Sequence, residues 1–105
     1  MAKAEILPGN CGFTTIVETS MDGDVCKVTI VSECKAIQKL ALELTEVNPY
    51  QEISYRRGTP PVLQLGAKYC THTACPVPVG IIKAVEVEAG MALPMEVTIK
   101  ITKPS

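Results

Sequence analysis

The chain has 105 residues, the size of one ordinary domain, and we expect a single domain over residues 1–105. Its net charge of -1 provides no basic surface for nucleic acid or an anionic membrane, so we expect neither partner. The apolar runs are shorter than the roughly 20 residues of a membrane-spanning helix, and the first residues lack the apolar core of a secretory signal. These features predict a cytoplasmic protein.

The chain contains five cysteines, which is an odd number and a smaller share than the roughly 8–10% typical of small secreted disulfide scaffolds. In a reducing compartment, clustered cysteines are more often metal ligands, redox groups or buried packing than structural disulfides. The positions of these cysteines within the predicted elements therefore become important.

A β-hairpin is predicted by two segments rich in valine, isoleucine and threonine, at residues 13–17 and 25–32, with the turn sequence MDGD between them. In the second segment Cys26 shares a face with Val28 and Ile30, whereas polar residues alternate with them. We therefore interpret Cys26 as a small apolar residue of the core.

The sequence SECKAIQKLALELTEV, at residues 32–47, predicts a helix that Asn48-Pro49 ends. Its apolar residues recur at the spacing of one helical face: Ile37, Leu40, Ala41, Leu44 and Val47. Ser32 is the expected cap, which places Cys34 in the first turn. There, unpaired N–H groups and the positive end of the helix dipole favour a thiolate.

The second half of the chain has weaker patterns. The sequence EISYR is compatible with a short strand, and residues 62–68 with one or two helical turns. The sequence TACPVPVGIIKAVEVEAG predicts a helix with Cys75 at the cap, Pro76 at the first position and Gly90 at the end. The alternation in VEVEA leaves a strand open as an alternative there.

Near the end of the chain, LPMEVTIKITK alternates Val97, Ile99 and Ile101 with polar residues. This alternation predicts a half-buried strand over residues 95–102, which would cover a sheet edge or form a dimer. Taken together, the predicted elements indicate an α+β domain, with a small, mainly antiparallel sheet and helices packed on one face.

Four cysteines fall at boundaries between predicted elements: Cys11, Cys34, Cys70 and Cys75. Strand ends and helix starts meet at a common edge of such a sheet, so the loops there can supply one shared site. Thiolates, with His72 as a further candidate ligand, are the soft ligands that zinc and iron-sulfur clusters prefer. In the alternative interpretation Cys70 is buried packing, Cys75 caps a helix and His72 lies in a surface loop.

The motif NCGF before a strand pair, Cys34 at a helix start and the later YCTHTACPVPVGIIKAVE resemble the iron-sulfur cluster assembly scaffold family of IscU and the NifU N-terminal domain. The sequence HTACPVPVGIIKAVE is also similar to TSCPD-type domains. The resemblance covers roughly residues 10–90, by the order and spacing of short motifs. We also expect the chain to belong to a small family without an assigned activity.

This resemblance implies an IscU/NifU-N-like fold and an iron-sulfur site. By position it nominates Cys11, Cys34, Cys70 and Cys75, with His72 as an additional candidate. The scaffolds usually carry an aspartate directly after Cys-Gly, where this chain has phenylalanine. That aspartate is associated with a transferable cluster, so the resemblance does not extend to cluster transfer.

Three functions follow from these patterns. The first is binding of an iron-sulfur cluster or a metal ion such as zinc, with a protein client or a homodimer as partner. The second is a structural or partner-binding subunit with a zinc site or no metal. The third is a thiol-dependent enzyme or redox protein in which Cys70 or Cys75 is the nucleophile and His72 its base. Because no acid or oxyanion motif accompanies these residues, enzymatic activity is the least favoured of the three.

Overall fold

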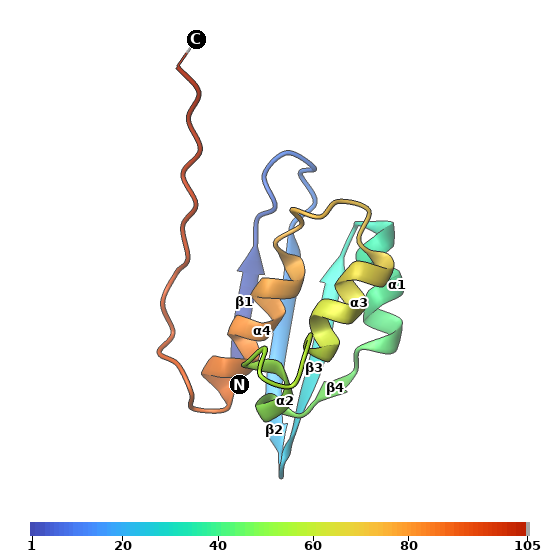
Figure 1. Cartoon of the computed structure of the whole chain (residues 1–105), viewed down its shortest axis with the longest axis vertical. Helices are drawn as coiled ribbons and strands as arrows, with labels where there is room; N and C mark the ends of the chain where they lie inside the picture. Colours follow the sequence, from blue (N-terminus) through green and yellow to red (C-terminus); the bar gives the residue numbers. More distant parts are fainter. Residues whose placement is uncertain (105) are drawn as a thin grey trace.

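A four-stranded antiparallel sheet, in the order β1-β2-β3-β4, carries its helices on one face (Figure 1). The computed structural model describes residues 1–104. The strands are β1 (Ala2–Ile6), β2 (Thr15–Asp22), β3 (Val25–Ser32) and β4 (Glu46–Val47). The helices are α1 (Lys35–Glu43), α2 (Pro49–Glu52), α3 (Pro61–Tyr69) and α4 (Val77–Glu88). The predicted α+β class is confirmed.

The β2–β3 hairpin is the centre of the sheet. Alternate residues of β2 are buried, including Val17 and Thr19, while Glu18 faces solvent, as the two-residue period of a strand requires. Cys26 on β3 is fully buried in the core, as its alternation with polar residues predicted. Strand β1 was not predicted, because its sequence AKAEI has little intrinsic strand preference and forms a strand by pairing with β2.

Helix α1 buries Ile37 and Leu40, and Leu44 at its C-cap is buried as well, as predicted, but the helix ends earlier than predicted. Val47 does not continue the helical face. Residues 46–47 instead form β4, which pairs with β3, and the Thr45 C=O accepts a hydrogen bond from the Val28 N–H at 2.9 Å. Pairing with a neighbouring strand therefore outweighs helical periodicity at this end of α1.

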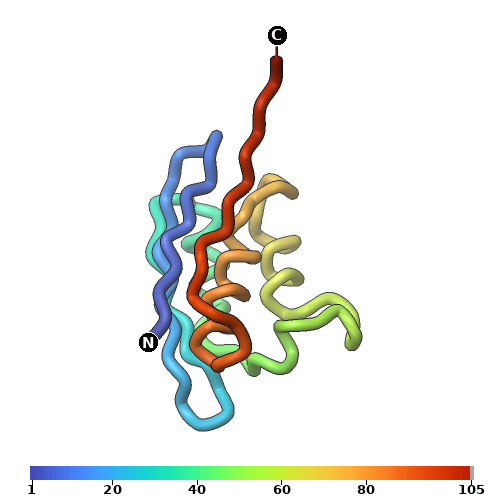
Figure 2. Tube along the Cα trace, turned by 90° about the vertical axis from the view of Figure 1, so that its left-hand side faces the viewer, coloured from blue at the N-terminus to red at the C-terminus, as the bar shows by residue number. Residues whose placement is uncertain are grey.

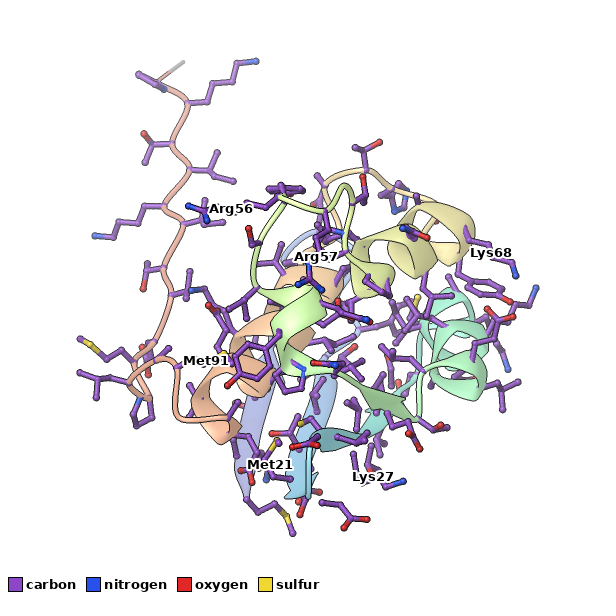
Figure 3. The ribbon with its side chains drawn as sticks, turned by 60° about the horizontal axis from the view of Figure 1, so that its bottom comes forward. Met21, Lys27, Arg56, Arg57, Lys68 and Met91 are labelled. Carbon is purple, nitrogen blue, oxygen red and sulfur yellow. The ribbon has the colours of Figure 1, made fainter. Side chains whose placement is uncertain are left out.

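Helix α3 lies between α1 and α4. Lys68 near its end donates to Glu43 of α1 at 3.2 Å (Figure 3). The strand considered for EISYR is wrong, because α2 ends at Glu52 and the following residues form turns.

Helix α4 begins one residue later than predicted, with Pro76 at the cap. It ends at Glu88, and Gly90 follows the cap residue with a φ of 77°, which permits hydrogen bonds from the Gly90 and Met91 N–H groups back to α4.

The crossing of α3 and α4 leaves no room for a side chain at Gly66. A Cβ atom built there would lie 2.7 Å from Cγ of Pro78 on α4. Gly80 on α4 lies even closer to Ile6 of β1, where an added Cβ would collide with the isoleucine side chain. Glycine at these two positions lets α4 pack closely against both α3 and the sheet.

The predicted strand over residues 95–102 is not formed. Residues 92–104 run in the direction of β1 without joining the sheet and extend past its end, and Val97, Ile99 and Ile101 are exposed (Figures 1 and 2). The residue pattern suits a strand, but within the described chain no other strand lies beside it to complete the hydrogen bonds.

A buried carboxylate caps helix α3. Pro60 and Pro61 provide no side-chain cap, and the Val62 N–H donates instead to Oε1 of Glu52 at 3.0 Å. Only 3% of Glu52 is exposed, and this burial raises the pKa of the carboxyl group, although the hydrogen bond from Val62 opposes the shift. The folded chain therefore holds the Glu52 proton more tightly than the unfolded chain does.

We expect Glu52→Gln to become more stable relative to the parent as pH rises from about 4.5 to neutral. The raised pKa contributes stability that is complete below the unfolded-state pKa and is lost as pH rises through the folded-state pKa. Glutamine keeps an acceptor for the Val62 N–H but cannot titrate. Urea unfolding of both proteins across this pH range measures the difference.

Glu43→Gln is the matched control. Tyr69 and Lys68 lower the pKa of exposed Glu43, so its contribution to stability is present at neutral pH and is lost as pH falls. This variant should change with pH in the opposite direction from Glu52→Gln. A pH-independent difference between Glu52→Gln and the parent would contradict the assignment of a raised pKa to Glu52.

Candidate functional site

The four boundary cysteines all lie toward one end of the sheet, opposite the β2–β3 turn (Figure 1). Cys11 lies in the β1–β2 loop, and Cys34 directly precedes α1. Cys70 and Cys75 lie in the connection between α3 and α4. The antiparallel chain path therefore brings three separate boundaries to a common end, as the sequence predicted.

Three of these cysteines form a cluster, which we call the cysteine cluster: Cys34, Cys70 and Cys75. Each is partly buried and packs against the hydrophobic core. Burial raises the pKa of the Cys70 thiol to about 12, assisted by the adjacent Cys75 thiol and then by Cys34. The chain thus places three partly buried thiols from two distant segments at the same end of the sheet.

Backbone hydrogen bonds position the cysteine cluster. The Cys34 N–H donates to Oγ of Ser32 at 3.1 Å, and its C=O accepts the first hydrogen bond of α1. The Cys70 N–H donates to the Gly66 C=O at 2.8 Å at the end of α3. The Cys75 N–H donates to the His72 C=O at 3.2 Å, which closes a turn before α4. Each thiol is thus attached to a hydrogen-bonded part of the backbone.

The other two predicted site residues are not part of the cysteine cluster. Cys11 is exposed in a loop where Gly9 and Gly12 both have positive φ, and the Gly12 N–H donates to the Gly9 C=O at 3.0 Å. His72 is exposed in the turn between α3 and α4. Both residues therefore lie at the same end of the sheet as the cysteine cluster, but their side chains are exposed to solvent.

No three His, Cys, Asp or Glu side chains in residues 1–104 are grouped closely enough to hold a metal ion without rearrangement. The five cysteines are free thiols. The cysteine cluster consists of neighbouring soft ligands whose sulfur atoms do not yet form a coordination sphere. Binding a metal there requires a change of side-chain rotamers or of the adjoining loops.

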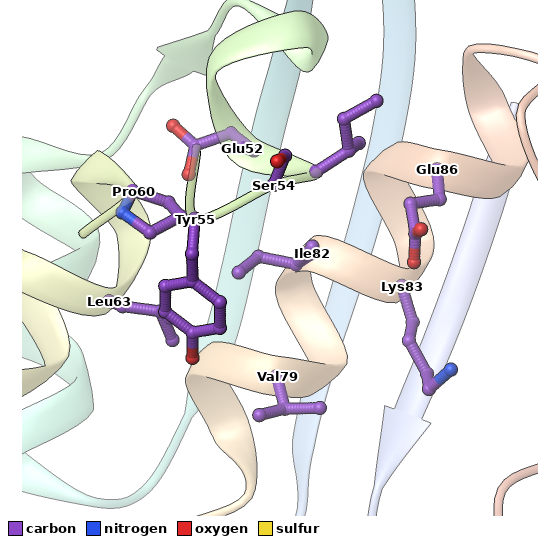
Figure 4. A pocket seen from close by; sticks show the side chains of 10 residues that line it. Glu52, Ser54, Tyr55, Pro60, Leu63, Val79, Ile82, Lys83 and Glu86 are labelled. Carbon is purple, nitrogen blue, oxygen red and sulfur yellow. The ribbon is translucent and has the colours of Figure 1, made fainter. Parts of the chain in front are cut away.

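A small open cavity lies between the loop after α2 and helix α4 (Figure 4). Its volume is about 220 Å³, and its walls include Tyr55, Leu63, Val79 and Ile82. Small-molecule sites usually enclose roughly 300–1,000 Å³ and contain convergent polar groups. This cavity is smaller than that range, and the cysteine cluster remains the stronger candidate site.

These features define an α+β domain with three thiols gathered at one end of an antiparallel sheet. The model of a family described as "Family of unknown function (DUF6951)" matches residues 2–101, and the chain belongs to this family. Searches of curated proteins and of solved structures each found no significant match. Within the described residues, no helix has the length and apolar character needed to cross a membrane.

Proposed function

We propose that this protein binds a thiolate-ligated metal centre, either an iron-sulfur cluster or a zinc ion, at the cysteine cluster. The observation that carries the proposal is that Cys34, Cys70 and Cys75 come from separate parts of the chain, lie toward the same end of the sheet and are each partly buried against the core. Thiolates are the preferred ligands of iron-sulfur clusters and of many structural zinc sites.

The raised pKa of Cys70 is consistent with this chemistry. Without a cation, a second or third negative charge in a partly buried thiol group is unfavourable, so Cys70 retains its proton at neutral pH. A bound cation reverses this local electrostatic effect, because a thiol that coordinates a metal ion is deprotonated. Metal binding at the cysteine cluster would therefore release protons.

A fourth ligand is available from the same end of the molecule. Zinc sites and iron-sulfur clusters commonly use four protein ligands. We propose Cys11 as the fourth, because the exposed β1–β2 loop lies at the end of the sheet where the cysteine cluster is found. His72, in the loop that joins two of the clustered cysteines, is the alternative fourth ligand.

The resemblance to cluster assembly scaffolds favours an iron-sulfur cluster over zinc. The same resemblance departs at Phe13, which is partly exposed where those scaffolds have an aspartate. We therefore propose a centre that the protein retains, with delivery to a client protein as the less favoured use.

Metal analysis of the anaerobically purified chain tests this proposal. We expect either iron and sulfide in comparable amounts with visible thiolate-to-iron absorption, or about one zinc ion per chain. Reconstitution with iron and sulfide, or with zinc alone, identifies the preferred centre if the isolated protein is empty. A folded protein that stays free of both metals after reconstitution would refute the proposal.

Removal of the metal should lower stability without unfolding the domain. The buried core is formed by apolar side chains of the sheet and the helices, including Leu40, Val62 and Ile81. With metal at 100 times its dissociation constant, the bound form gains about 2.7 kcal/mol. Thermal unfolding with and without a chelator measures this gain, and complete loss of helical circular dichroism on chelation would instead indicate a metal-dependent fold.

The thiol-enzyme alternative is supported less well. A cysteine nucleophile reacts as the thiolate, whereas the Cys70 thiol stays protonated at neutral pH. His72, the candidate base, is exposed to solvent. Among the described residues, no buried side-chain nitrogen or oxygen lacks a hydrogen-bond partner, so none is left free to bind a reacting group. The geometry therefore favours metal binding over nucleophilic catalysis.

A further inference from the structure

The C-terminal part of the chain has the pattern of a strand but no partner for it. We call residues 95–102 the terminal segment. Its apolar side chains are strongly exposed: Met95 77%, Val97 57%, Ile99 77% and Ile101 87%. They alternate with polar residues, so a strand formed here would have one apolar and one polar side.

The backbone of the terminal segment is also unpaired within the described chain. The sheet contains only β1 to β4, and the last turn or loop hydrogen bond before the segment is donated by Met91. Figures 1 and 2 show that the segment starts at the end of the sheet where α4 finishes, runs along the sheet and extends beyond its other end. Exposed alternating apolar residues with free backbone groups are typical of a strand that pairs with another chain.

Strand β1 offers the matching surface. It pairs with β2 on one side only, which leaves its other backbone edge open. Ala4 and Ile6 of β1 pack with the core, whereas Lys3 and Glu5 are exposed on the other face. A strand added at this edge would place its apolar side toward the helices and its polar side beside that exposed pair of charges.

We propose that the terminal segment of each chain pairs with β1 of a second copy, which gives a homodimer with exchanged strands. Within its own chain the segment follows α4, whose Glu88 accepts a hydrogen bond from the Met21 N–H at 3.1 Å near the start of β1. The segment then runs in the same direction as β1 (Figure 1), so pairing within one chain would be parallel.

A two-fold axis perpendicular to the strands reverses the direction of the second copy. Its terminal segment would then meet β1 in the antiparallel orientation that the rest of the sheet uses. Both segments are buried by one reciprocal exchange, and both open β1 edges are covered. A second copy therefore satisfies the geometry better than pairing within one chain.

The test compares the full chain with a chain that ends at Pro94, by light scattering during size-exclusion chromatography and by amide hydrogen exchange. We expect a dimer with slowly exchanging amides in the terminal segment for the full chain, and a folded monomer for the shortened chain. Helical circular dichroism of the shortened chain checks that its fold is intact, because the deleted residues 95–104 are exposed and contribute nothing to the core.

A point variant gives a second test. Ile99→Pro removes a backbone donor from the middle of the terminal segment and should abolish the dimer, whereas Ile99→Val should preserve it. Three results would overturn the proposal: a monomeric full chain with rapid exchange, a monomeric full chain with protected terminal amides, and a dimer that survives the deletion. The second of these would identify pairing within one chain.

Discussion

A Cys75→Ser variant is expected to lose more than roughly 100-fold in metal affinity, because even groups behind the direct ligands typically change affinity by 10–100-fold. Cys75 is partly buried against the core and lies in the same α3–α4 connection as Cys70. Serine preserves the size of the side chain but replaces the soft sulfur ligand. Metal content after reconstitution, followed by competition with a chelator of known affinity, measures the loss.

Controls separate the cysteine cluster from the other thiols. Cys34→Ser should reduce affinity as much as Cys75→Ser does, whereas Cys26→Ala should leave it unchanged, because Cys26 is buried in the core of the sheet. Cys11→Ser tests the identity of the fourth ligand. A loss of metal affinity smaller than that of Cys75→Ser but larger than that of Cys26→Ala assigns the fourth position to Cys11. Full metal content in both Cys34→Ser and Cys75→Ser would show that the centre lies elsewhere or does not form.

The second large effect concerns the helix crossing that supports the site. Gly66→Ala is expected to destabilise the fold by about 1–3 kcal/mol, because the new methyl group would lie 2.7 Å from the rigid ring of Pro78. The better helix propensity of alanine, about 1 kcal/mol, offsets part of this cost. Urea unfolding measures the net change in the free energy of unfolding.

A double-mutant cycle identifies the cause. Adding Pro78→Ala should recover part of the loss, because the methyl group then meets a smaller side chain. The crossing also positions Cys70 at the end of α3 and Cys75 just before α4, so Gly66→Ala should weaken metal binding as well. Strictly additive effects of the two substitutions would contradict a direct contact between these positions.

Local periodicity was sufficient for the parts of the fold that form a half-buried pattern by themselves. Two segments rich in valine, isoleucine and threonine, with a turn sequence between them, predicted the hairpin, and the alternation around Cys26 predicted the buried thiol. The spacing of Ile37, Leu40 and Leu44 predicted α1. Gly90 also ends α4 as predicted, because glycine accepts the positive φ that the cap requires.

The incorrect predictions occur where a tertiary partner decides the structure. Val47 continues the helical spacing of α1 but lies in β4, because β3 provides a neighbouring strand. Strand β1 has a weak local pattern and forms through pairing with β2. Residues 95–102 are the opposite case: their alternation strongly favours a strand, but the described chain provides no neighbouring strand to pair with them. Local pattern and available pairing are separate conditions for a strand.

For the candidate site, the sequence indicated which end of the sheet carries the cysteines but not how each side chain is oriented. The boundaries that carry the four cysteines lie toward one end of the sheet, and Cys34, Cys70 and Cys75 are partly buried there against the core. Cys11 and His72 face solvent instead. The orientation of a loop side chain depends on loop conformation, which short motifs do not specify. The Cys11→Ser variant tests ligation by Cys11.

X-ray absorption spectroscopy of the reconstituted protein tests the central claim most directly. For zinc, we expect three or four sulfur neighbours at about 2.3 Å, and one fewer in Cys34→Ser. For iron, sulfur should dominate the nearest shell, and iron–iron scattering should accompany a cluster. A nearest shell of nitrogen and oxygen alone, or a sulfur shell unchanged in Cys34→Ser, would contradict a metal centre at the cysteine cluster.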